Sequence, residues 1–317
     1  MKKTILFLAV AAICGAANAT ILRVSNVTNS GAPYSEISQA ISAAEEGDTI
    51  MVDGSNTSYG NITLTKRVVL IGPGFLLSDN SLVAEGSPSA KISNLSSNYN
   101  QAAGSIIMGM DITGSVTLSQ PNMVITRCRV GSIISIANSA SNIVIHQNYL
   151  SGTVYCITSS SYAPGTQITN NIFARANDQK DGIIHNISNG TIAYNTFTKT
   201  GNWADYPVNI ANLANCTVEH NIFVGSAVTI EGCVIQDNYW SGAADESLLK
   251  NCTTDKAVKE TTEANISAFS GKGAFAGNDP YVISGIPAGP YISDITVPTS
   301  VEQGQTLKVN VKLGVQQ

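Results

Sequence analysis

The stretch that decides the fold is Ile145-His-Gln-Asn-Tyr-Leu150, because the chain repeats its pattern. Each copy has, in order, an aliphatic residue, two variable residues, a fourth residue that is usually Asn, one variable residue and a large apolar residue. The other copies are Ile125-Thr-Arg-Cys-Arg-Val130, Ile168-Thr-Asn-Asn-Ile-Phe173, Ile192-Ala-Tyr-Asn-Thr-Phe197, Val218-Glu-His-Asn-Ile-Phe223 and Ile235-Gln-Asp-Asn-Tyr-Trp240. Their fourth positions lie 20, 23, 24, 26 and 17 residues apart. Such a period is typical of a solenoid.

Two solenoids use an Asn at this period, the leucine-rich horseshoe and the parallel β-helix. The horseshoe motif LxxLxL is absent, and the segments between copies are short alternating runs such as Ser132–Ile136 and Val208–Ile210. These runs are rich in β-branched residues and indicate strands. The repeat therefore predicts a β-helix. The Asn residues should occupy one sharp corner in the left-handed conformation and form an amide ladder, with copies about 4.8 Å apart.

The two ends of the solenoid carry different signals. Ile37, Ala40, Ile41 and Ala44 have helical spacing, which predicts an amphipathic capping helix of about three turns near 35–46 that ends near Gly47. At the other end, the link Ile286–Pro290 precedes Leu307–Leu313, which alternates strictly and predicts a single strand. We therefore expect a β-helix over 20–285 and a separate tail over 286–317.

The N-terminus has the features of a secretory signal peptide. A basic Met1–Lys3 start, an apolar Ile5–Ile13 run and the small residues of Ala17-Asn-Ala19 predict cleavage after Ala19 and export to the periplasm, cell surface or medium. No later stretch is long and apolar enough for a transmembrane helix. The formal charge of −5 argues against a nucleic-acid partner.

The chain resembles the secreted right-handed parallel β-helix proteins of the pectate-lyase-like superfamily, and is most similar to uncharacterised exported bacterial members. Besides the Asn repeats, the resemblance rests on Ala40–Val52, Tyr59–Leu64, Val69–Gly74 and Asn278–Pro290. It implies a right-handed parallel β-helix. The superfamily includes polysaccharide lyases, hydrolases, epimerases and adhesins, so the fold alone does not assign an activity.

Lyases of this superfamily typically bind calcium through several acidic side chains and use Arg or Lys as the base. In this chain the acidic residues of 120–240 do not recur in neighbouring repeats. The basic residues there are Arg127, Arg129, Arg175, Lys180 and Lys199. The lyase pattern therefore has no obvious counterpart here.

The repeat register predicts one candidate catalytic group. The residues just before the ladder position include Tyr194, His220 and Asp237, which should be neighbours on adjacent coils. Asp237 could orient His220 and raise its pKa, leaving His220 or Tyr194 to transfer a proton. The alternative is a solvated polar column with no catalytic role.

Two long connections predict a binding site, because loops on a rigid scaffold often bind ligands. They follow Phe173 and Phe197, and their aromatic and charged residues suit a polysaccharide. The candidate substrate-binding residues are Arg175, Asp178, Lys180, Asp181, Trp203, Asp205 and Tyr206. Asp178 and Asp181 could also bind calcium. The alternative is a pair of tolerated insertions, with Trp203 folded back as a plug.

The cysteines give one further expectation. Cys216 and Cys233 each lie two residues before the aliphatic residue of their repeat, so both should point inward and stack in adjacent coils. We expect two packed thiols rather than a disulfide, because neighbouring parallel strands seldom provide the required torsion.

Three functions remain open from the sequence. The first is a secreted or cell-surface protein that binds a polysaccharide through the long loops and the polar column. The second is a polysaccharide lyase or glycoside hydrolase that uses Tyr194, His220 and Asp237, or the carboxylates of Asp178, Asp181 and Asp205. The third is a structural or adhesive solenoid without a small ligand.

Overall fold

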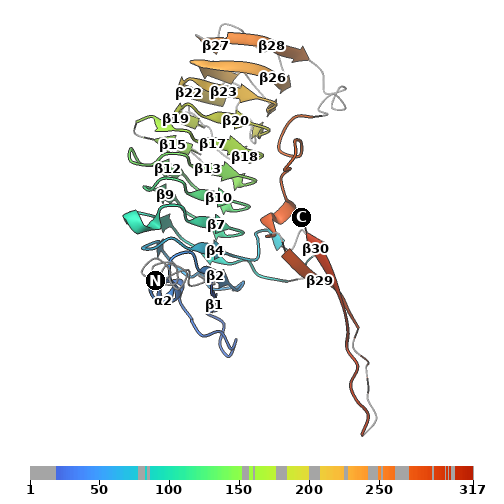
Figure 1. Cartoon of the computed structure of the whole chain (residues 1–317). Coiled ribbons are helices and arrows are strands. Elements are labelled where there is room, and N and C mark those ends of the chain that lie inside the picture. The colour runs from blue at the N-terminus through green and yellow to red at the C-terminus, as the bar shows by residue number, and fades with distance from the viewer. Residues whose placement is uncertain are drawn as a thin grey trace, which may run out of the picture.

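The structure is a computed structural model in which strands stack coil upon coil (Figure 1). It describes residues 19–77, 83, 86–151, 157–159, 161–175, 184–199, 208–224, 228–241, 249–250, 253–260, 271–287, 289–296, 298, 300 and 304–316. All structural statements below concern these residues. Within them the chain is a right-handed parallel β-helix, which confirms the fold predicted from the repeat.

The strands form three stacks, and each stack is one face of the coil. Face 1 contains β1 (Ile21–Val24), β2 (Thr49–Val52), β4 (Val69–Ile71), β7 (Ile106–Met108), β10 (Val124–Thr126), β13 (Val144–His146), β17 (Gln167–Thr169), β20 (Thr191–Ala193), β23 (Cys216–Glu219), β26 (Cys233–Ser241) and β28 (Thr253–Glu260). Face 2 contains β5 (Lys91–Ile92), β8 (Asp111–Ile112), β11 (Arg129–Val130), β14 (Tyr149–Leu150), β18 (Ile172–Arg175), β21 (Thr196–Lys199) and β24 (Ile222–Val224), and pairs with the second half of β26.

Face 3 closes each coil. It contains β3 (Ile62–Thr63), β6 (Leu95–Ser96), β9 (Val116–Leu118), β12 (Ile134–Ile136), β15 (Ile157–Ser159), β19 (Ile184–Ser188), β22 (Val208–Ala214), β25 (Val228–Glu231) and β27 (Leu249–Lys250), with β16 (Ala163–Pro164) paired to β19. A short 3₁₀ turn, Asn100–Ala102, lies between β6 and β7.

The core consists of columns of like residues, because the register places each repeat position above the same position in the previous coil. On face 1, Ile125 pairs with Ile145 and Ile145 with Ile168, and all three are fully buried. On face 2, the rings of Phe173 and Phe197 stack with centroids 4.4 Å apart. Stacked aromatic pairs add about 0.5–1.5 kcal/mol each beyond their buried area, so this column stabilises the coil stacking.

The recurring Asn of the repeat forms the predicted amide ladder between faces 1 and 2. The Asn195 Oδ1 atom accepts from the Asn171 backbone N–H at 2.9 Å and from its Nδ2 at 3.0 Å. Asn195 Nδ2 donates to the Ile168 carbonyl at 2.8 Å and to Asn221 Oδ1 at 3.0 Å. The same bonding runs through the fully buried side chains of Asn148, Asn171, Asn195, Asn221 and Asn238.

The prediction that the ladder Asn itself takes the left-handed conformation is wrong. The residue just before each of the five ladder Asn residues does so, for example Gln147 with φ 55° and Tyr194 with φ 55°. The reason is that this turn points the following amide inward, where it bonds to both neighbouring coils. The outward-facing preceding residue therefore carries the strain of a positive φ.

The capping helix is α2 (Ile37–Ala43), shorter than the predicted three turns. It ends at Ala43 because Ala44 is already extended, with ψ 148°. Its apolar side faces the first coil: Ile37, Ala40 and Ile41 are buried, and the helix contacts β1, β2 and β3. The helix thus covers the open end of the first core layer.

The two predicted stacked cysteines lie next to each other. Cys216 on β23 pairs in register with Cys233 on β26, both are buried, and no disulfide joins them. This confirms the packed arrangement. Burial raises the pKa of the Cys216 thiol and raises that of the Cys128 thiol to about 12, so neither is a reactive thiolate at neutral pH.

The C-terminal part differs from the predicted continuous coil to residue 285. The last described coil strand ends at Glu260, and residues 271–287, here called the strap, run back along the outside of the stack (Figure 1). The strap includes a 3₁₀ turn at Ile283–Gly285. The predicted single strand is half of an antiparallel hairpin, β29 (Gly289–Thr296) with β30 (Asn310–Gln316), which extends away from the body.

Candidate functional site

The candidate site belongs to a column of outward-facing side chains at the corner between faces 1 and 2. Its members precede the ladder position and share a left-handed backbone with φ of 53–55°. We call this set the corner column: Arg127, Gln147, Asn170, Tyr194, His220 and Asp237. A positive φ is costly for such residues, and the amide ladder beneath them fixes it. The backbone thereby aims one side chain per coil in the same direction.

The strap covers the lower half of the corner column through hydrogen bonds to its own backbone carbonyls. Arg127 Nη1 donates to the Ile286 carbonyl at 3.1 Å. Gln147 Nε2 donates to the Pro280 carbonyl, and Asn170 Nδ2 to the Ala276 carbonyl at 2.8 Å. An extended segment outside a sheet has unpaired carbonyls that need donors. The first three column residues therefore hold the strap and are themselves buried.

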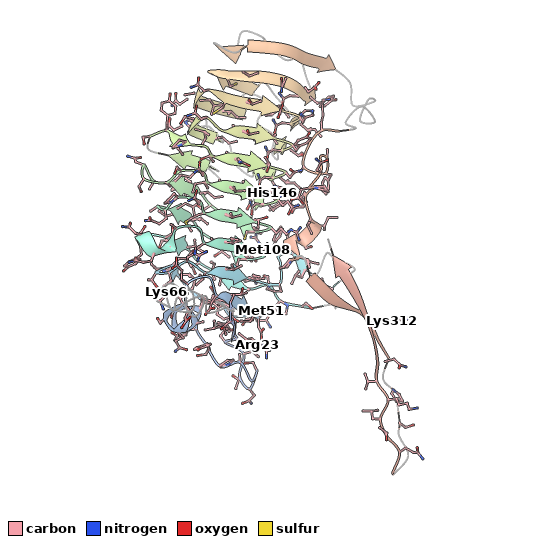
Figure 2. The ribbon with its side chains drawn as sticks, in the orientation of Figure 1. Arg23, Met51, Lys66, Met108, His146 and Lys312 are labelled. Atoms are coloured by element: carbon pink, nitrogen blue, oxygen red, sulfur yellow. The ribbon has the colours of Figure 1, made fainter. Side chains whose placement is uncertain are left out.

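Asp279 fixes the middle of the strap. Its Oδ1 accepts from Gln147 Nε2 at 2.8 Å, and its Oδ2 lies 2.9 Å from His146 Nε2. The other ring nitrogen of His146 lies 2.8 Å from the Thr169 hydroxyl. Figure 2 shows His146 at the strap-facing side of the stack. The neighbouring Arg127 has a pKa lowered by burial, an effect that the negative charge of Asp279 opposes.

An apolar cluster supports the strap over face 2. Phe75, Ala274 and Tyr281 are buried together against Tyr149 and Ile172. Burial raises the pKa of the Tyr281 phenol, which stays neutral. These contacts and the column bonds give the strap a structural role, and they remove the lower coils of the column from any binding surface.

The side chains in the upper half of the corner column are partly exposed to solvent. The rings of Tyr194 and His220 stack with centroids 4.8 Å apart, and His220 Nε2 lies 3.7 Å from Asp237 Oδ2. The His220 side chain is 28% exposed and that of Asp237 51% exposed. The strap approaches by backbone alone: Gly273 N–H donates to the His220 carbonyl, and Gly277 lies against the Tyr194 ring. The three residues predicted as neighbours are therefore brought together.

The structure adds two residues that the repeat alignment missed. Glu219 ends β23, and its Oε2 lies 4.0 Å from His220 Nδ1. Gln236 is its register partner on β26 and donates its side-chain amide to Glu219 Oε2. Their position is two before the ladder Asn, an outward position on face 1. The same register reasoning applied one residue earlier would have found them. We call Tyr194, Glu219, His220, Gln236 and Asp237 the upper corner cluster.

The predicted loop residues fall mostly beyond what the structure describes. The backbone of Arg175 is the last residue of β18 and pairs with Lys199 on β21. The remaining candidates, Asp178, Lys180, Asp181, Trp203, Asp205 and Tyr206, lie outside the described residues, and with them the possible calcium ligands. The strand register nevertheless places the starts of both loops on adjacent coils, as the sequence predicts.

Two further findings concern the described residues. No group of three or more His, Cys, Asp or Glu side chains in them is arranged to hold a metal ion. No helix among them is long and apolar enough to cross a membrane.

Comparison with known proteins does not assign the chain to a family. No family model, curated protein or solved structure matches the chain. The β-helix thus rests on the register and ladder of the chain itself.

Proposed function

We propose that the protein is an exported member of the pectate-lyase-like superfamily that binds a polysaccharide at the upper corner cluster and the two long loops. One observation carries the proposal: the strap bonds to the side chains of the lower column, whereas its described contacts higher up are a hydrogen bond to the His220 backbone carbonyl and the packing of Gly277 against the Tyr194 ring. A rigid row of polar side chains suits a repetitive ligand, because successive coils present equivalent positions about 4.8 Å apart.

The chemistry of the cluster supports a ligand rich in hydroxyl groups. It offers a phenol, an imidazole, two carboxylates and an amide, which together donate and accept hydrogen bonds. The loop that contains Trp203 begins after β21, a strand that starts beside the corner at Thr196. A four-residue strand spans roughly 13 Å, so the loop starts within a few sugar units of the cluster.

An oligosaccharide array with the mature protein tests this proposal. We expect binding to at least one polysaccharide class, weakened several-fold by Tyr194→Phe. Tyr162→Phe is the matched control, because it removes a phenol hydroxyl from an exposed tyrosine on another part of the coil. Absence of binding across the array, or equal effects of the two variants, would contradict the proposal.

A polysaccharide-degrading enzyme is the second candidate, favoured by the position of His220 between the carboxylates of Glu219 and Asp237, at 4.0 and 3.7 Å. An imidazole oriented by carboxylates beside a phenol is suited to general acid–base catalysis. Assays for reducing ends and for unsaturated products separate the candidates. A binding protein gives neither signal, whereas an enzyme gives one that His220→Gln abolishes.

A structural or adhesive solenoid is the third possibility and is an outcome of the same tests. It predicts no glycan binding and no product, with unchanged fold in all variants.

A further inference from the structure

The outward side of face 1 changes its chemical character along the stack. In the lower coils the outward positions form a patch that we call the apolar stripe: Met51, Val69, Ile71, Ile106, Met108 and Val124. All six side chains are at least partly exposed, and Figure 2 shows Met51 and Met108 on this side of the stack. In the upper coils the corresponding positions hold Gln167, Thr191 and Thr217. The lower coils therefore present a continuous apolar sheet face.

The six residues of the apolar stripe carry no charge. The charged residues in register with them lie at the two ends of the stripe, where Arg23 binds Asp53 and His146 binds Asp279. A soluble protein rarely leaves a continuous apolar patch uncovered, because burial of such area is worth about 25 cal/mol per Å². The stripe is therefore suited to another apolar protein surface rather than to a charged ligand.

The C-terminal hairpin carries a second apolar face. Every second residue is apolar over 307–315, and alternation places these residues on one face of the strand: Leu307, Val309, Val311, Leu313 and Val315. The partners of the last three in β29 are Ile295, Ile292 and Pro290, and directly paired residues share a face. A register shift after Ile292 keeps these pairs aligned. The hairpin is therefore amphipathic, and the side chains of Leu307 and Val309 are 52% and 43% exposed.

The hairpin needs a surface to pack against. An isolated two-stranded hairpin is at best marginally stable in water, and a third strand or a packed face is required. Figure 1 shows that the hairpin extends away from the coils and past the first one. Its base is held at the level of β7, because the Pro287 ring lies against Gly109, the residue after Met108. The hairpin therefore reaches into the space that a second molecule would occupy.

We infer that this hairpin packs its apolar face on the apolar stripe of a second copy of the chain, and that the second copy returns the same contact. The dimensions of the two surfaces agree. The paired apolar residues span Val311–Val315, roughly 13 Å, and the step from β2 to β10 covers three coil spacings, roughly 14 Å. A hairpin that lies along the solenoid axis crosses the coil strands near a right angle, which is one of the two usual arrangements of stacked sheets.

The size of the contact requires that it be formed twice. A stable interface buries about 1,200–2,000 Å² in total, and one short hairpin on one stripe covers only part of this area. Two identical contacts related by a two-fold axis double the buried area and leave neither hairpin exposed. The inference does not depend on the proposed ligand, because the apolar stripe and the upper corner cluster lie on different coils.

Sedimentation velocity of the protein over about 1–100 µM tests the inference, because a dimer is favoured by mass action at the upper end of this range. Two variants should each weaken the dimer at least tenfold, since each places a charge in both contacts: Met51→Glu in the stripe and Val309→Glu in the hairpin. Val234→Glu is the matched control, on the outward side of face 1 but outside the stripe. The exposed fractions of the three side chains are nearly equal, 42%, 43% and 41%, so the monomer should tolerate all three changes alike. Thermal unfolding checks that the variants are folded.

A mixture of the two variants tests the exchange itself. A dimer of Met51→Glu with Val309→Glu keeps one intact contact, formed by the hairpin of the first chain and the stripe of the second. The other contact contains both changes, and a contact that one charge has broken loses little more from a second. We therefore expect fluorescently labelled Met51→Glu protein to sediment as a dimer with Val309→Glu protein at concentrations where neither variant forms a dimer alone.

Four results would overturn the inference. The first is a protein that stays monomeric across the concentration range, and the second is a control variant as damaging as the other two. The third is a dimer that Met51→Glu weakens and Val309→Glu does not, which would mean that the stripes of two copies pack directly on each other. The fourth is a mixture of the two variants that forms no dimer, which would exclude the reciprocal exchange.

Discussion

Asn195→Ala should be among the most destabilising single substitutions in the chain. The Asn195 side chain is fully buried and makes four ladder hydrogen bonds, two as acceptor and two as donor. Its removal leaves the Asn171 backbone N–H and the Ile168 carbonyl without these partners. Each buried orphan costs about 1–3 kcal/mol, so we expect a loss of about 2–6 kcal/mol from a stability that is typically about 5–15 kcal/mol.

Urea unfolding followed by circular dichroism measures this loss. Asn195→Asp should be worse than Asn195→Ala, because it keeps the volume but places a buried negative charge against the Asn221 Oδ1 atom and the Ile168 carbonyl. Asn56→Ala, at an exposed position, is the control and should cost less than about 0.5 kcal/mol. A loss below about 1 kcal/mol for Asn195→Ala, or a tolerated Asp, would refute the ladder as a source of stability.

Three further predictions follow from the sequence and structure. Cys216 and Cys233 should both label as free thiols in the unfolded, unreduced protein, and oxidation of the two to each other would contradict their packing as thiols. Trp203→Ala should abolish most glycan binding with little change in melting temperature, whereas a buried plug would cost roughly 3–5 kcal/mol and lower it by many degrees. The backbone N–H groups of Thr20 and Glu45 lower the pKa of Asp48, so its stabilising effect is present above the ordinary carboxyl pKa and is lost as pH falls through the lowered value. Melting temperatures of the wild type and Asp48→Asn should therefore converge in acid, and a constant difference across the pH range would refute this.

The fold could be predicted from the sequence because one position repeats with a fixed chemical need. A side-chain amide at the fourth position forms hydrogen bonds with both neighbouring coils. The inward-facing residues on either side of it lie in the core and must be aliphatic or aromatic. These demands leave Asn and large apolar residues at regular intervals. The conformation of the corner was misjudged for a physical reason: Asn is the common left-handed residue, but here its amide is required inside the coil, and Tyr194 or Gln147 takes the positive φ.

The strap could not be predicted because its partners are remote in sequence. Arg127 meets Ile286 across 159 residues and Asn170 meets Ala276 across 106, and such pairs leave no local pattern. For the same reason, only part of the candidate site could be predicted from the sequence. Stacking of Tyr194, His220 and Asp237 follows from register alone, whereas the covering of the lower coils depends on a segment that has no repeat.

Hydrogen exchange of the protein with and without an oligosaccharide that it binds on the array tests the central claim most directly, namely that a polysaccharide binds where the strap leaves the side chains of the corner column partly exposed. We expect added protection in peptides from 191–197, 217–223 and 233–241, and none in 124–150, which the strap already covers. Protection confined to 124–150, or an exchange pattern that the oligosaccharide leaves unchanged, would contradict it.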